Sequence, residues 1–232
     1  MALNPQSTSL TWRIVLRALL GFVVIIVLVF GSAGRWDYWQ GWVYLSLALI
    51  AMAMMWMVLP KDSDLVEERL HPGEGMKGWD RVYFALSTPM YLLAAIVAGA
   101  DVGRFGWTGH LPPSFYLFSI VFYTIGQGLF LWARYVNRYF SSVARIQLDR
   151  GQTVCNVGPY RFVRHPGYVG GILFGIAMPL ILGSLWALTP QVIAALLLVW
   201  RTYKEDRMLQ AELPGYAAYS KETRYRLLPG IW

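Results

Sequence analysis

Long apolar stretches alternate with short polar ones along most of the chain. The apolar stretches occupy residues 12–33, 38–59, 80–100, 114–135, 167–183 and 188–208. A helix needs about 20 apolar residues to cross a hydrocarbon core about 30 Å thick, and each stretch comes close to that length, with 167–183 the shortest. The pattern therefore predicts an all-α, polytopic membrane protein with about six transmembrane helices.

The last two apolar stretches are separated only by residues 184–187. So short a connection predicts an antiparallel helical hairpin. Thr189 followed by Pro190 predicts the beginning of its second helix, because Thr caps helices and Pro is tolerated at the first helical position. We divide the chain into an N-terminal four-helix membrane region, residues 1–135, and a C-terminal core, residues 136–232.

The composition agrees with a membrane protein. Of the 232 residues, 56% are hydrophobic and 14% are charged, whereas soluble globular domains carry about 25% charged residues. An ordinary water-soluble domain is therefore excluded. The single cysteine excludes an internal disulfide, and with only three histidines and no His or Cys pair at ligand spacing we expect no metal site.

The basic residues predict the orientation of the chain. Of the 20 Lys and Arg, all but Arg35 and Arg104 fall at the N-terminus, in the connections 60–81 and 134–166, or at the C-terminal end. The positive-inside rule then places both termini and these connections in the cytoplasm. The apolar run 14–30 is longer than the apolar part of a cleavable signal, so we expect the first stretch to stay as an anchor.

Two cytoplasmic segments, residues 134–164 and 201–226, carry most of the charge. Arg201 and Glu205 lie four residues apart on one helix face, which suits either a simple ion pair or a functional site at the membrane edge. Gly167, Gly171 and Gly175 share another face, where a helix or a ligand can approach the backbone closely. A helix beginning at Gly167 would present free N–H groups to an anion.

The motifs in these segments resemble a known family. They are Gly158-Pro159-Tyr160, Arg164-His165-Pro166-x-Tyr168-x-Gly170, Arg201-Thr202-x-x-Glu205-Asp206-x-x-Leu209, and then Tyr216 and Tyr219. Residues from about 137 to 232 resemble the membrane methyltransferases related to isoprenylcysteine carboxyl methyltransferase. The loop from Gly75 to Asp80 resembles one in bacterial relatives.

The resemblance implies S-adenosylmethionine as cofactor, with S-adenosylhomocysteine as product. Arg201 corresponds to the family's arginine on the substrate side. The chain departs from the prenylcysteine enzymes at Gly171 and Ile172, where they have aromatic residues, so the acceptor stays open. The implied cofactor residues are Gln147, Gln152, Thr153, Val154, Cys155, Tyr160, His165, Pro166, Gly167, Tyr168 and Glu205.

The chemistry favours a lipophilic acceptor with a carboxylate, since a carboxylate has no proton to remove and Arg201 offers it a matching fork. An amine or hydroxyl acceptor would need a base, for which His165 is the candidate. Cys155 is a poor candidate nucleophile because no base lies near it in sequence. The alternatives are a nicotinamide-dependent membrane reductase of the sterol-reductase type, a phospholipid or amine N-methyltransferase, and a transporter or scaffold. The expected partners are the acceptor and the bilayer, and no nucleic acid.

Overall fold

The computed structural model describes residues 5–58 and 75–232, and every regular element in these two ranges is helical. The all-α prediction is confirmed. Lys61 and Arg69, which contribute to the predicted orientation, lie outside the described residues. The main helices are α1 (Pro5–Ala33), α2 (Trp39–Val58), α4 (Gly78–Ala100), α5 (Pro113–Val136), α6 (Pro166–Ile181), α7 (Leu188–Glu212) and α8 (Tyr216–Glu222).

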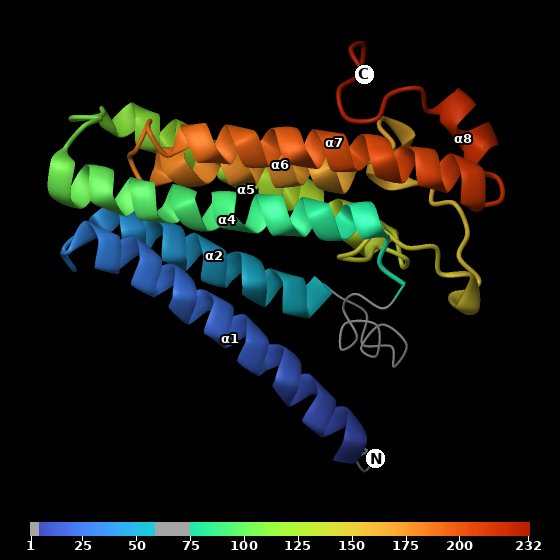
Figure 1. The fold of residues 1–232 in the computed structure, drawn as a ribbon, viewed down its shortest axis with the longest axis horizontal. Coiled ribbons are helices and arrows are strands. Elements are labelled where there is room, and N and C mark those ends of the chain that lie inside the picture. Colours follow the sequence, from blue (N-terminus) through green and yellow to red (C-terminus); the bar gives the residue numbers. More distant parts are fainter. Residues whose placement is uncertain (1–4, 59–74) are drawn as a thin grey trace.

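Helices α4, α5, α6 and α7 run along a common axis, whereas α1 lies obliquely to them (Figure 1). α5 packs chiefly on α6, α4 packs on both α7 and α1, and α6 and α7 form the predicted hairpin. The C-terminal tail, α8 and the segment between α5 and α6 lie toward the same end of the bundle (Figure 1). Since α4 and α5 pack on the hairpin, helices from both sides of residue 135 contact each other, and the division there stays a prediction.

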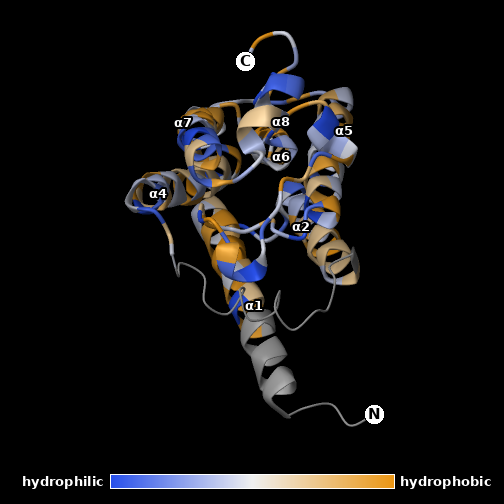
Figure 2. Cartoon of the chain, turned by 90° about the vertical axis from the view of Figure 1, so that its right-hand side faces the viewer, coloured by the Kyte–Doolittle hydropathy of each residue, from blue (hydrophilic) through white to orange (hydrophobic). Residues whose placement is uncertain are grey.

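Four helices are long and apolar enough to cross a membrane, which fits an integral membrane protein. They comprise residues Leu16–Ala33, Trp39–Met57, Gly78–Phe105 and Pro113–Val136, and they leave large apolar side chains such as Leu20, Val27 and Ile125 exposed. In Figure 2, viewed from the end with α8, hydrophilic residues gather on α8 and on the near parts of α5 and α7.

The hairpin does not confirm the expected count of six spans. α6 has 16 residues, and at 1.5 Å per residue it is about 24 Å long, shorter than a hydrocarbon core. It ends at Ile181, two residues before the expected boundary, because Gly183 adopts a left-handed φ of 80° that breaks the helix. α7 begins at Leu188 rather than Pro190, and Thr189 is not its cap, because Ala187 holds that position and donates its N–H to Ser184 Oγ.

Two glycines outside the predicted small-residue face bring α5 and α6 together. A Cβ on Gly126 would lie 2.6 Å from the backbone nitrogen of Phe174, and one on Gly170 would lie 2.6 Å from the carbonyl oxygen of Gly126. Larger residues would therefore push the helices apart. Gly167 instead contacts the ring of Phe140, where a Cβ would lie 2.5 Å from Cε2.

At the opposite end of the bundle, a buried carboxylate joins two connections. Asp101 begins the π-helix Asp101–Phe105 that extends α4, and its side chain is fully buried. It accepts hydrogen bonds from the backbone N–H of Thr108 at 2.9 Å, from the Thr108 hydroxyl, and from Ser184 Oγ at 2.6 Å. One carboxylate thus ties the α4–α5 connection to the turn of the hairpin.

Asp101→Ala is expected to lower the stability by about 2–4 kcal/mol, because it leaves buried donors of Thr108 and Ser184 without their charged acceptor. Thermal unfolding in detergent measures the loss. Asp101→Asn keeps one acceptor oxygen and should cost less. A midpoint that does not move in either variant would contradict this role.

Candidate functional site

A pocket opens at the end of the bundle that carries α8 and the C-terminal tail. Its walls come from the segment between α5 and α6, the first turn of α6, the last turns of α7, and α8. Space not filled by protein atoms amounts to about 720 Å³, including part that is open to solvent. Most of the predicted cofactor residues line it: Gln152, Thr153, Val154, Cys155, Tyr160, His165, Gly167, Tyr168 and Glu205.

Three predicted residues lie outside this lining. Gln147 is buried and braces the loop beside the pocket, donating from Nε2 to the Tyr139 carbonyl at 2.8 Å and from its backbone N–H to Gln152 Oε1 at 2.6 Å. Pro166 is buried as the first residue of α6. Arg201 is buried behind Tyr168, and its ion-pair partner is Asp80 of α4.

Glu205 and Tyr168 form one wall of the pocket. The Tyr168 hydroxyl donates to Glu205 Oε2, which links the first turn of α6 to α7. The Tyr168 ring stacks on the His165 ring with centroids 5.5 Å apart, and the guanidinium carbon of Arg201 lies 5.2 Å from the Tyr168 ring centroid. The wall therefore combines a carboxylate facing the pocket with a fixed aromatic ring.

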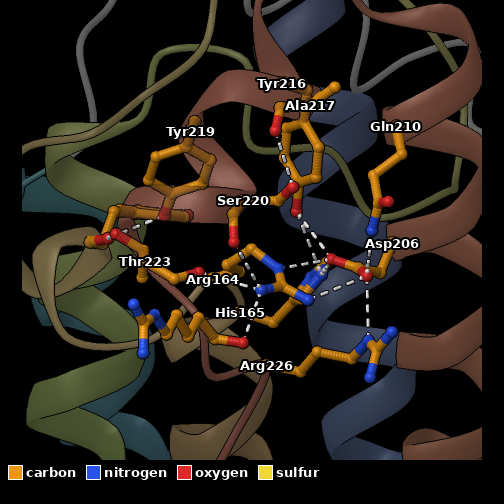
Figure 3. A network of polar contacts seen from close by, with 12 residues as sticks. Arg164, His165, Asp206, Gln210, Tyr216, Ala217, Tyr219, Ser220, Thr223 and Arg226 are labelled. Carbon is orange, nitrogen blue, oxygen red and sulfur yellow. Dashed lines mark hydrogen bonds and ion pairs between the residues drawn. The ribbon is translucent and has the colours of Figure 1, made fainter.

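A buried network centred on Asp206 supports the pocket from behind (Figure 3). Asp206 is fully buried and receives Arg164 through both oxygens, with Nε at 2.7 Å from Oδ1 and Nη2 at 3.0 Å from Oδ2. Its further partners are Arg226 and Gln210, both at 2.8 Å, Tyr216 at 3.1 Å and His165 Nε2 at 3.4 Å. Because Arg164, His165 and Tyr216 also line the pocket, the network fixes three of its side chains.

The C-terminal tail is bound to the same motif. The backbone N–H groups of Arg164 and His165 donate to the carbonyls of Tyr225 and Arg226 at 2.9 and 3.0 Å. Arg164 Nη1 also donates to the Thr223 carbonyl at 2.8 Å. These backbone hydrogen bonds and the arginine together hold the tail against the first turn of α6.

The phenols and the thiol around the pocket are held in their neutral forms. Burial raises the pKa of Tyr160 and Tyr219, whose hydroxyls contact Asn137 Nδ2 and the Tyr160 carbonyl. Burial also raises the pKa of the Cys155 thiol, which donates to the Val136 carbonyl at 3.7 Å. These groups suit binding and shaping of a ligand better than nucleophilic attack.

Several residues of the site escaped the sequence-based prediction. Arg164, Asp206 and Tyr216 stand inside the recognised motifs, but the sequence assigns them no partners. Arg164 and Asp206 lie 42 residues apart, so only their opposite charges hinted at a pair. Asp80 is more distant still. The resemblance of the loop 75–80 to one in bacterial relatives drew attention to it, but the sequence did not indicate Arg201 as its partner.

The four apolar helices fit an integral membrane protein, and the pocket at one end of the bundle is its candidate site. Residues 117–211 match the model of the isoprenylcysteine carboxyl methyltransferase (ICMT) family. The matched segment is less than half of the chain, and together with the apolar helices it supports a membrane methyltransferase. Comparison with curated proteins gives no further match. Arg201, Glu205 and Asp206 lie inside the matched segment, whereas Asp80 and Tyr216 lie outside it.

Proposed function

We propose that the protein is an S-adenosylmethionine-dependent methyltransferase that methylates a lipophilic acceptor, with a carboxylate as the favoured acceptor group. The observation that carries the proposal is the pocket, because residues scattered over the motifs between Gln152 and Glu205 converge on it. The family match supports methyl transfer as the reaction class.

The chemistry of the lining fits this cofactor. Glu205 offers a carboxylate to the amino group or the ribose hydroxyls, and the Gln152 amide adds polar contacts. Tyr160 and Tyr168 provide aromatic faces for the adenine. The first turn of α6 at Gly167 offers the positive end of a helix to the cofactor carboxylate.

The bound cofactor supplies a methyl group on a sulfonium, ready for in-line displacement. The chain aligns the two reactants and excludes water from the pocket, because in-line displacement depends on both. Tyr168 and Glu205 fix the wall, and α8 covers the pocket with Tyr216 and Tyr219. Arg201 would orient the acceptor carboxylate from the side of α4, beyond the Tyr168 ring.

The charge distribution adds an orientation to the proposal. The positive-inside rule favours a cytoplasmic pocket with cytoplasmic termini, where a polar cofactor enters from water. The acceptor would enter from the lipid between helices. Binding assays separate this function from a nicotinamide-dependent reductase, which would bind a dinucleotide instead.

The direct experiment measures binding of S-adenosylhomocysteine to purified protein by calorimetry, followed by transfer of labelled methyl groups to a membrane lipid extract. Base-labile product would indicate a methyl ester and hence a carboxylate acceptor, whereas base-stable product would favour an amine. Binding of NADPH without binding of S-adenosylhomocysteine would contradict the proposal.

The single cysteine provides a built-in reporter of the pocket. Cys155 lines it and is partly exposed, so S-adenosylhomocysteine should slow its alkylation by a maleimide by about tenfold or more at saturation. Because burial raises its pKa, alkylation should accelerate at a higher pH than for free cysteine. Mass spectrometry of time points gives both rates. Equal rates with and without the ligand would argue against binding at this pocket.

A further inference from the structure

Asp80 forms a buried junction between three parts of the chain. It lies in the first turn of α4 and is fully buried. Its Oδ1 accepts from Arg201 Nε at 2.7 Å, and its Oδ2 accepts from Arg201 Nη2 at 3.2 Å and from the backbone N–H of Ala144 at 2.7 Å. One carboxylate therefore joins α4, α7 and the segment that walls the pocket.

The same contacts fix the guanidinium of Arg201 in one orientation. Its carbon lies 4.8 Å from the ring centroid of Tyr83 and 5.3 Å from that of Phe84, both on α4, and Nη2 also donates to the Ser142 carbonyl at 2.9 Å. Nε and Nη2 are thus engaged, while Nη1 makes no hydrogen bond among residues 16–57 and 75–232, whose side chains the structure describes. The guanidinium is held through Nε and Nη2, and Nη1 is its remaining donor group.

The position of this grip points to the acceptor rather than the cofactor. Glu205 lines the pocket, and Arg201 lies one helical turn, about 6 Å, farther from the pocket end of α7. The rings of Tyr83 and Phe84 surround Arg201 with apolar surface from α4. A lipophilic molecule with a carboxylate would meet its charged partner at this depth.

We propose that Asp80 is a positioning residue for methyl transfer, which acts through Arg201 by holding its Nε edge so that Nη1 faces the acceptor. The inference rests on the proposed function. It adds a residue of α4, outside the family match, to the machinery of the site. Through the Ala144 N–H, Asp80 also holds the segment 141–145, of which Ser141, Val143 and Arg145 line the pocket.

The chain offers a matched control for a merely structural brace between the same two helices. Lys77, just before the first residue of α4, pairs with Glu212 at the end of α7 at 2.8 Å, but the Glu212 side chain is exposed and the Lys77 side chain is partly exposed. Lys77→Ala removes an ion pair between α4 and α7 without touching Arg201. If the ion pairs served only to join α4 and α7, Asp80→Asn and Lys77→Ala would lower the activity in the same way and differ only in the size of the loss.

The test compares Asp80→Asn, Lys77→Ala and wild type in the affinity for S-adenosylhomocysteine and in kcat and KM for methyl transfer to a lipid extract. Asp80→Asn should lower kcat/KM for the extract about 10- to 100-fold, because a misplaced group costs that much, while the cofactor affinity stays within about twofold. Lys77→Ala should resemble wild type. Arg201→Lys keeps the charge but lacks the planar guanidinium. It should show the same loss of kcat/KM with unchanged cofactor affinity, and it provides a second variant in case Asp80→Asn does not fold.

A double-mutant cycle decides whether Asp80 acts through Arg201. In the Arg201→Lys background, Asp80→Asn should have little further effect, whereas independent action would multiply the two losses. Full activity of Asp80→Asn, or parallel loss of cofactor affinity and turnover, would overturn the inference. Failure of wild type itself to bind S-adenosylhomocysteine would overturn the proposed function instead.

Discussion

Asp206→Ala is expected to destabilise the protein by about 3–5 kcal/mol, because it leaves buried cationic partners without their carboxylate. Arg164 is 5% exposed and receives Asp206 in a two-point contact, and Arg226 shares the same carboxylate. The thermal unfolding midpoint in detergent should fall by roughly 10 °C. The binding of S-adenosylhomocysteine that we propose should weaken in parallel, since Arg164 and His165 line the pocket.

An exposed pair with the same geometry serves as the control. Arg35 contacts Asp37 through Nε and Nη2 at 2.7 and 2.6 Å, yet Asp37 is 72% exposed. Water screens such a pair, so Asp37→Ala should leave the unfolding midpoint unchanged. A similar fall of the unfolding midpoint in Asp206→Ala and Asp37→Ala would show that burial does not determine how much the Asp206 network contributes to stability.

Much of the fold could be read from the sequence because membrane helices depend on local composition. The apolar stretches located α2, α4 and α5 to within a few residues of their ends. The helix boundaries at the hairpin were less accurate, since they depend on Gly183 and on the contact of Ser184 with Ala187 and Asp101. Such contacts between distant segments leave no periodic signal.

The candidate site divides in the same way. Motif residues from Gln152 to Tyr168 lie close together in sequence, so their convergence on one pocket could be predicted. The residues that hold this motif in place could not be predicted from the sequence. Asp80 and Arg201 are 121 residues apart, and the spacing of Arg201 and Glu205 suggested a local pair instead.

Neighbouring carboxylates on α7 show why sequence proximity misleads. Glu205 and Asp206 are adjacent, but successive residues of a helix point about 100° apart. Glu205 therefore faces the pocket and Tyr168, whereas Asp206 faces Arg164 and the C-terminal tail. The two adjacent carboxylates therefore differ in position: one lines the pocket and the other supports it, and the packing of α7 against α6 and α8 separates them.

Glu205→Ala is expected to reduce binding of S-adenosylhomocysteine below detection by calorimetry, because it removes the carboxylate that faces the pocket and the acceptor of the Tyr168 hydroxyl. Loss of a charged hydrogen-bond partner costs about 1.5–3 kcal/mol, and release of the Tyr168 ring adds to the effect. Methyl transfer to the lipid extract should disappear with it.

Two companion variants separate the roles of charge and shape. Glu205→Gln keeps an oxygen for the Tyr168 hydroxyl but loses the charge, so it should bind S-adenosylhomocysteine more weakly than wild type and more tightly than Glu205→Ala. Glu212→Ala removes an exposed carboxylate two turns farther along the same helix and should bind normally. Unchanged affinity in Glu205→Ala would remove this residue from the cofactor site, and an equal loss in Glu212→Ala would point to the general charge of α7 as the cause.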